Sequence, residues 1–137
     1  MKKIIAAALF MIAVSALMLS FICCSGGKSD RASYRIISQE EAAELMAHEK
    51  DCVILDVRRE DEFAEKHIKG ALNIPNESIG AGELTSLPDK DQLIMIYCRS
   101  GNRSKQAAEK LVKLGYTNII EFGGIITWNG ETASGND

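Results

Sequence analysis

From residue 34 onward the chain alternates apolar runs with polar segments of helical character. A strand covered on both faces reads as a continuous apolar run, and β-branched residues favour it. Residues 52–57 (CVILDV) and 93–97 (LIMIY) have this pattern, and residues 34–37, 71–74 and 118–122 are shorter or weaker examples of it. The pattern predicts five strands.

The polar segments between these strands predict helices. Ser38, followed three residues later by Glu41, forms a capping box, and the apolar positions after it predict a helix to about residue 49. In residues 104–114 the apolar positions lie three and four apart, and Gly115 stands where a left-handed C-cap is expected. Short helical segments are expected at 60–66 and 83–87, and a loop rich in turn formers at 76–82.

The order of these elements predicts the fold class. Strands separated by helices imply right-handed crossovers and a mainly parallel sheet between two helical layers, an α/β fold. In such sheets the functional site lies beyond the carboxyl ends of the strands. The loop from Cys98 to Arg103 lies at one of these ends, directly before a predicted helix, so we expect the chemistry there.

The amino-terminal segment has a different character. Lys2 and Lys3 precede nineteen residues, 4–22, that contain nothing more polar than serine. This pattern predicts an export signal, although the apolar run exceeds the usual length in a cleaved signal. Cys23 and Cys24 follow at once, which resembles the end of a bacterial lipoprotein signal peptide and predicts lipidation of Cys24 or, alternatively, Cys23. An uncleaved anchor is the other reading, because the run is almost long enough to span a bilayer.

Both readings place the remaining chain outside the cytoplasmic membrane, since the two lysines stay inside. We expect residues 1–24 to be the signal or anchor, residues 25–33 a flexible tether, and residues 34–137 one domain with one core.

The charge balance argues against a nucleic-acid partner. The formal net charge is −3 and becomes −5 once Lys2 and Lys3 are left out. Cys52 and Cys98 are the cysteines of the domain, and the apolar context of Cys52 predicts a buried hydrophobe rather than a disulfide partner.

The loop 98–103 (CRSGNR) combines features that favour an ionised thiol. A cysteine is nucleophilic as the thiolate, and loop amides, the start of a helix and nearby cations stabilise that negative charge. Gly101 lets the backbone turn tightly, so that the amides converge. The cations are Arg99, Arg103 and Lys105. The loop therefore predicts a nucleophilic Cys98 that faces a small anion.

A simpler reading of this loop is a solvated turn. Cysteine is an unusual choice for such a turn, and two arginines near a helix start oppose its dipole unless an anion is bound there. No histidine is close in sequence to serve as a base: we expect His48 on the surface and His67 in a structural role. The two histidines and two domain cysteines lack the spacing of metal ligands, so no metal site is predicted.

Three segments together resemble the single-domain rhodanese family of sulfurtransferases. They are ILDVRREDEFAEKHIKGALNIP (54–75), YCRSGNRS (97–104) and FGGIITW (122–128). The resemblance covers residues 34–128 and implies a rhodanese-like three-layer α/β/α fold with an open five-stranded parallel sheet. Lys66 replaces the family's usual glycine, which leaves the local turn open.

The resemblance also implies roles for individual residues. Cys98 would carry sulfur as a persulfide, and Arg103 together with Arg99 would hold the sulfonate of a donor such as thiosulfate. Asp56, Arg58 and His67 would support the site structurally, and Trp128 would pack on the domain. The loop that cradles the sulfur comprises Arg99, Ser100, Gly101, Asn102, Arg103 and Ser104.

The implied reaction is sulfur transfer to cyanide or a thiol through Cys98, without a cofactor. Four residues separate Cys98 from Arg103, whereas cysteine phosphatases have five, so phosphate or arsenate chemistry ranks lower. A tethered persulfide carrier or redox module with little turnover of small donors remains an alternative.

Overall fold

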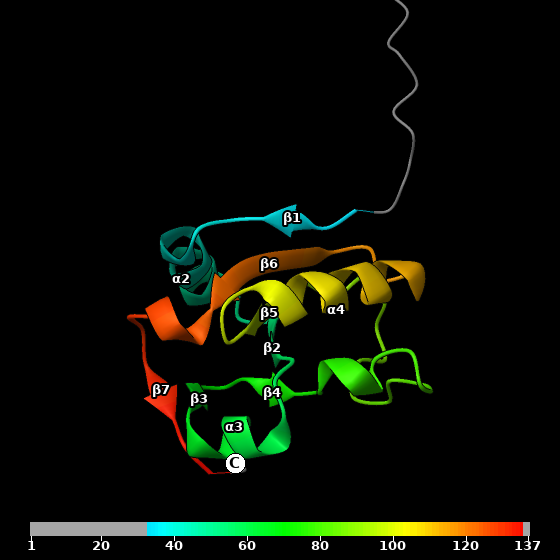
Figure 1. Ribbon diagram of the computed structural model, residues 1–137. Helices are drawn as coiled ribbons and strands as arrows, with labels where there is room; N and C mark the ends of the chain where they lie inside the picture. The colour runs from blue at the N-terminus through cyan, green and yellow to red at the C-terminus, as the bar shows by residue number, and fades with distance from the viewer. Residues whose placement is uncertain (1–32, 136–137) are drawn as a thin grey trace, which may run out of the picture. The chain divides into compact units, whose positions relative to one another are not determined.

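The computed structural model describes residues 33–135, and its central feature is a parallel sheet of five strands (Figure 1). The strand order is β1-β6-β5-β2-β4, and every neighbouring pair is parallel. The strands are β1 (Arg35–Ile36), β2 (Val53–Asp56), β4 (Leu72–Asn73), β5 (Ile94–Cys98) and β6 (Ile119–Gly124). The predicted fold class and all five predicted strands are confirmed.

Within residues 33–135, three α-helices cover the two faces of this sheet. α4 (Asn102–Lys113) packs through Ala107, Ala108 and Leu111 on one face, against apolar residues of β2, β5 and β6. α2 (Gln39–His48) and α3 (Glu60–Glu65) cover the other face, where Met95, Tyr97, Ile120 and Phe122 are buried. Removing these side chains from water is the main favourable contribution to folding.

The helix ends follow the predicted signals. The Ser38 hydroxyl accepts a hydrogen bond from the Glu41 amide at 3.2 Å, and the Glu41 carboxylate accepts one from the Ser38 amide at 2.9 Å, so the capping box is confirmed. At the end of α4, the amide of Tyr116 donates to the carbonyl of Leu111 and that of Gly115 to the carbonyl of Val112. These two bonds form a Schellman motif around the predicted C-cap.

The segment between β4 and β5 differs from the prediction. Residues 83–87 form no helix, but a single turn closes there, in which the Leu87 amide donates to the Leu84 carbonyl at 2.9 Å. A 3₁₀-helix, η1 (Asn76–Ser78), begins instead directly after Pro75, inside the predicted loop. A second 3₁₀-helix, η2 (Ile125–Thr127), follows β6.

A small antiparallel pair lies beside the main sheet and was not predicted. It joins β3 (His67–Ile68) to β7 (Thr132–Ala133). Each strand has two residues, too few to show an alternation, and the pairing links distant parts of the sequence.

The predicted signal segment, both candidate lipidation cysteines and nearly all of the tether lie outside the described residues. Within residues 33–135, no helix has the length and apolar character needed to cross a membrane.

Candidate active site

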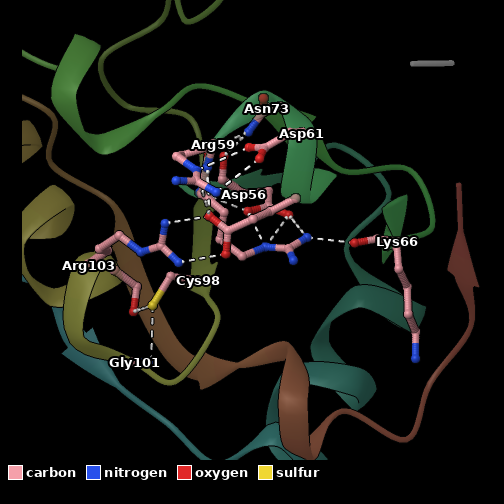
Figure 2. Close-up of polar contacts among 11 residues, drawn as sticks. Asp56, Arg59, Asp61, Lys66, Asn73, Cys98, Gly101 and Arg103 are labelled. Carbon is pink, nitrogen blue, oxygen red and sulfur yellow. Dashed lines mark hydrogen bonds and ion pairs between the residues drawn. The ribbon is translucent and has the colours of Figure 1, made fainter. Parts of the chain in front are cut away.

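Cys98 ends β5 at the carboxyl edge of the sheet, where the chain bends into α4. Its thiol is buried, with 1% of the residue exposed. The sulfur accepts hydrogen bonds from the Gly101 amide at 3.1 Å and from the Ser104 hydroxyl at 3.5 Å. Figure 2 shows the sulfur directed toward the turn of the loop at Gly101. The loop therefore folds back over its own cysteine.

The turn of this loop depends on Gly101. Its φ of 100° lies in the left-handed region, which costs other L-residues energy through a clash of Cβ with the backbone. Gly101 is also the N-cap of α4, so the helix begins at Asn102, two residues earlier than predicted. This conformation aims the Gly101 amide at the sulfur.

Hydrogen bonds around the sulfur determine its acidity. Burial alone would raise the pKa of the Cys98 thiol, because it disfavours the charged form. The hydroxyl and amide of Ser104, with the amides of Ser100 and Gly101, outweigh burial and lower that pKa below its usual value. A lower pKa leaves more thiolate near neutral pH, so Cys98 is placed as a nucleophile.

Arg103 lies above Cys98 but is engaged by a carboxylate (Figure 2). Its Nη1 and Nη2 donate to the two carboxylate oxygens of Glu62 in α3, at 2.7 and 2.9 Å. The bond from Arg103 is the main reason that the pKa of Glu62 is lowered to about 2. The sequence did not indicate this pair, because Glu62 is 41 residues away; sulfonate binding by Arg103 stays a prediction.

Other cations of the predicted site are exposed. Arg99 forms no ion pair with any residue between 33 and 135, and Lys105 points outward on the exposed side of α4. Arg99 lines a cavity of about 430 Å³. The other lining residues are Arg58, Glu62, Glu65, Lys66, Ile125, Ile126 and Trp128. Three basic side chains, two glutamates and apolar surface therefore line this cavity beside the loop.

Asp56 and Arg58 form a buried ion pair near the site. The Arg58 Nη2 lies 2.6 Å from the Asp56 Oδ2, and the Arg58 amide and Nε also donate to this carboxylate. The same Nη2 donates to the carbonyl of Lys66 at 2.7 Å, as Figure 2 shows. The pair therefore ties the end of β2 to the end of α3.

His67 and Lys66 have structural surroundings. The His67 ring stacks on Phe63 at 3.8 Å, and its Nδ1 lies 2.9 Å from the Phe63 carbonyl oxygen. Lys66 has a φ of −165°, extended backbone that any residue adopts, so the turn does not require the family's glycine. Trp128 is half-buried with its ring 5.8 Å from that of Phe122.

The structure gathers only part of the predicted loop around the sulfur. Ser100, Gly101 and Ser104 contribute donors, whereas Asn102 is exposed at the start of α4. Cys52 and Cys98 are both free thiols, and residues 33–135 contain no cluster of three side chains able to hold a metal ion.

Glu121 is a site residue that the sequence reading missed. It lies in β6 with 1% of the residue exposed, and its Oε1 accepts from the Ser104 hydroxyl at 2.6 Å and the Gly123 amide at 2.9 Å. An acidic residue within an otherwise apolar run (IIEF) was the available signal.

Comparisons with known proteins agree with this geometry. A family profile described as the rhodanese-like domain matches residues 38–131. Thiosulfate sulfurtransferase PspE from Escherichia coli (strain K12) is 37% identical over 71 residues, which cover 52% of this chain and 68% of PspE. Thiosulfate sulfurtransferase GlpE from Coxiella burnetii (strain RSA 331) is 35% identical over 96 residues, which cover 69% of this chain and 87% of GlpE.

A solved structure has the same fold. The structure described as rhodanese with anions from E. coli superposes with a TM-score of 0.57 at 32% sequence identity. The match covers 61% of this chain and 99% of that one.

Proposed function

The chain belongs to the rhodanese-like domain family, and we propose that it is a sulfurtransferase that moves sulfane sulfur from thiosulfate, or a related donor, through a persulfide on Cys98. The observation that carries this proposal is the pair of donors on the sulfur, the Gly101 amide and the Ser104 hydroxyl, which stabilise a buried thiolate.

The proposed cycle has two displacement steps. The Cys98 thiolate attacks the outer sulfur of thiosulfate, the bond between the two donor sulfurs breaks, and its electron pair leaves with sulfite. Cys98 then carries a terminal sulfur. Cyanide or a thiolate attacks this sulfur, and the electron pair of the broken bond returns to Cys98. Amides of the loop stabilise negative charge on sulfur in both steps, and no cofactor is needed.

Arg99 supports donor binding in this proposal. It is exposed beside the loop and lines the neighbouring cavity, so its guanidinium can meet the sulfonate end of thiosulfate. Arg103 can join it through N–H donors that Glu62 does not use, because the two bonds to Glu62 take two of the five donors of a guanidinium. The amide-lined start of α4 attracts the same charge.

Loop length distinguishes sulfur transfer from phosphate chemistry. Four residues lie between Cys98 and Arg103, and the amides of this short loop converge on one sulfur atom. A phosphatase activity that exceeds thiosulfate turnover would reverse this ranking, as would a corresponding arsenate reductase activity.

The burial of Cys98 supports a second candidate, a persulfide carrier that exchanges sulfur with a protein partner. A thiol with 1% exposure would shelter its persulfide from small acceptors in solvent. A stable persulfide with negligible thiosulfate:cyanide turnover would favour this carrier.

We also propose that the protein is exported and anchored to the cell membrane through a lipid on Cys24 or Cys23. Support comes from the basic start, apolar run and paired cysteines of residues 1–24. Cell fractionation combined with metabolic lipid labelling of Cys24→Ala and Cys23→Ala tests it; label retained in the double variant excludes lipidation at these cysteines.

Intact mass of the full chain after thiosulfate treatment tests the enzymatic proposal. We expect one added sulfur, mapped to Cys98 and removed by cyanide with formation of thiocyanate. A chain that stays unmodified at Cys98 would contradict thiosulfate as the donor.

A further inference from the structure

Glu121 is an unusual residue for its place in the sheet. It shares a face of β6 with Ile119, toward α4, where Ile94 and Ile96 of the neighbouring strand are also buried. Within residues 33–135 no cation forms an ion pair with it. Burial of a carboxylate without a cation costs free energy, so the hydrogen bonds that Glu121 accepts must offset this cost.

Glu121 lies directly beneath the loop that carries Cys98. β6 has a register irregularity against β5, where Ile96 pairs with Glu121 and Cys98 with Gly124. A methyl group added to Gly101 would lie 3.7 Å from the Glu121 Oε1. The carboxylate and the thiol are therefore on the same side of the sheet, with Ser104 between them.

Ser104 has one hydroxyl proton but two acceptors. Its Oγ lies 2.6 Å from the Glu121 Oε1 and 3.5 Å from the Cys98 sulfur, and Ser104 is fully buried. A hydroxyl donates once and accepts through its lone pairs. When its proton points to Glu121, the Ser104 oxygen has only lone pairs to offer the sulfur. The contact with Cys98 is then a hydrogen bond only if the thiol is protonated and donates. When its proton points to a thiolate, the carboxyl must donate to the hydroxyl oxygen.

We propose that Glu121 accepts the thiol proton of Cys98 through Ser104. The S–H bond of Cys98 breaks and its proton binds the Ser104 Oγ, while the original Ser104 proton moves to the Glu121 Oε1. One proton is transferred and no external reagent is consumed. Glu121 is a positioning residue that acts through Ser104, and this role rests on the proposed function of Cys98 as the nucleophile.

The relay explains how a buried thiolate forms without a histidine. Two anions on either side of Ser104 would repel each other strongly in a buried site. The transfer leaves one negative charge in the site and moves it from oxygen to sulfur. His67 does not take this part, because its ring stacks on Phe63 and its Nδ1 faces the Phe63 carbonyl.

Other charged groups that face the relay come from three elements. The pKa of Arg103 is raised mainly by its hydrogen bond to Glu62 of α3, and the charge of Cys98 adds to this effect. Tyr34, just before β1, has a pKa raised by burial and by the charges of Glu109 and Glu121. Because the pKa of Tyr34 lies above its usual value, its own titration falls outside the range in which the relay is tested.

The test is the alkylation rate of Cys98 in the full chain as a function of pH, measured peptide by peptide by mass spectrometry. It uses iodoacetamide and needs no sulfur donor, so it can fail independently of the proposed turnover. A coupled thiol and carboxyl lose their two protons in two macroscopic steps. We expect a two-step profile for the wild type, with a reactive plateau between the steps.

Two variants distinguish the relay from alternatives. Glu121→Gln keeps the shape but accepts no proton, and we expect a single step. Ser104→Ala keeps the Glu121 charge but removes the bridge, and we expect the lower step to disappear, with alkylation on the former plateau slowed about tenfold or more. Glu109→Gln removes one exposed charge from α4, so both steps should persist.

Two results would overturn the relay. One is a single-step profile in the wild type. The other is a two-step profile that survives in Ser104→Ala, since coupling would then act through space. If Glu121→Gln does not fold, the wild type and Ser104→Ala decide the question without it.

Discussion

The two free cysteines of the domain lie at opposite ends of neighbouring strands and have opposite surroundings. Cys52 stands just before β2, half-buried, and Cys98 ends β5, almost fully buried. Burial is the main reason that the pKa of Cys52 is raised, and the nearby charges of Glu49 and Asp51 raise it further. The more deeply buried Cys98 nevertheless has the lowered pKa.

The difference shows that hydrogen-bond donors, rather than exposure, decide which thiol is acidic. Amides converge on Cys98 because its strand runs into a tight turn and the first turn of α4. Cys52 lies at the amino end of its strand, after a helix has ended, and only its own amide and the charge of Lys50 act to lower its pKa. Cys98 therefore owes its hydrogen-bond donors to its position at the carboxyl edge of the sheet.

Replacement of each thiol by serine should give the largest contrast. We expect Cys98→Ser to lose thiosulfate:cyanide turnover by a factor on the order of 10³ or more, because the nucleophile is gone. Cys52→Ser should keep turnover close to that of the wild type. Steady-state assays measure both, and circular dichroism checks that each variant is folded. Turnover that survives in Cys98→Ser would refute the assignment.

A methyl group at Gly101 should weaken the cradle without removing the thiol. Gly101→Ala strains a left-handed residue by about 1–2 kcal/mol and turns its amide away from the sulfur. We expect a higher pKa of Cys98, slower alkylation at neutral pH and turnover reduced about tenfold. The pKa of Cys52, read from the pH dependence of alkylation, should not change.

Gly115→Ala is the matched control for this variant. Gly115 has a φ of 90° at the other end of α4, with no atoms within 4 Å of an added methyl group. It should lose a similar amount of stability, about 1–2 kcal/mol, yet retain turnover. An equal loss of turnover in both variants would show that stability, not the amide at Cys98, limits the reaction.

Much of this contrast could be predicted from the sequence. Apolar runs located β2 and β5, and the local signals of Ser38 and Gly115 located helix ends. Cys98 was found because its donors and its glycine follow within a few residues. Each of these features is formed by residues that lie close together in the sequence, so a single sequence is enough to predict them.

The unpredicted parts of the site depend on distant residues. The Glu62 carboxylate reaches Arg103 across 41 positions, and Glu121 reaches Ser104 across 17. These contacts arise only when the sheet brings β6 beside β5 and packs α3 near the start of α4. Spacing carries no information about them, although an acidic residue within an apolar strand was a visible anomaly.

The ion pair above Cys98 should have a moderate effect that depends on pH. Glu62 has a folded pKa of about 2, below the unfolded value of about 4.3. Its contribution to stability is therefore complete above the unfolded value and is lost as the pH falls toward 2. We expect Glu62→Gln to lower the free energy of unfolding at neutral pH by about 1 kcal/mol.

Urea unfolding of the wild type and Glu62→Gln at several pH values measures this effect. The difference between the two should shrink steadily below about pH 4.3. Glu60→Gln, an exposed change in the first turn of the same helix, is the control for loss of charge. A difference that stays constant down to pH 2 would mean that the Glu62 charge does not stabilise the fold.

Salt should produce the smallest effect and should act on Cys52 rather than Cys98. The exposed charges of Glu49 and Asp51 raise the pKa of Cys52 and together outweigh that of Lys50, which lowers it. At about 1 M salt the Debye length is about 3 Å, so all three charges are screened. Salt should therefore lower the pKa of Cys52 slightly. Glu49→Gln should have the same effect at low salt, whereas the control Glu40→Gln, at the other end of α2, should have none.

The Cys98 thiolate is stabilised by hydrogen bonds in a buried site, and salt screens these bonds little. Peptide-resolved alkylation at low and high salt measures both thiols together; a larger shift at Cys98 would mean that mobile ions, not fixed donors, set its acidity.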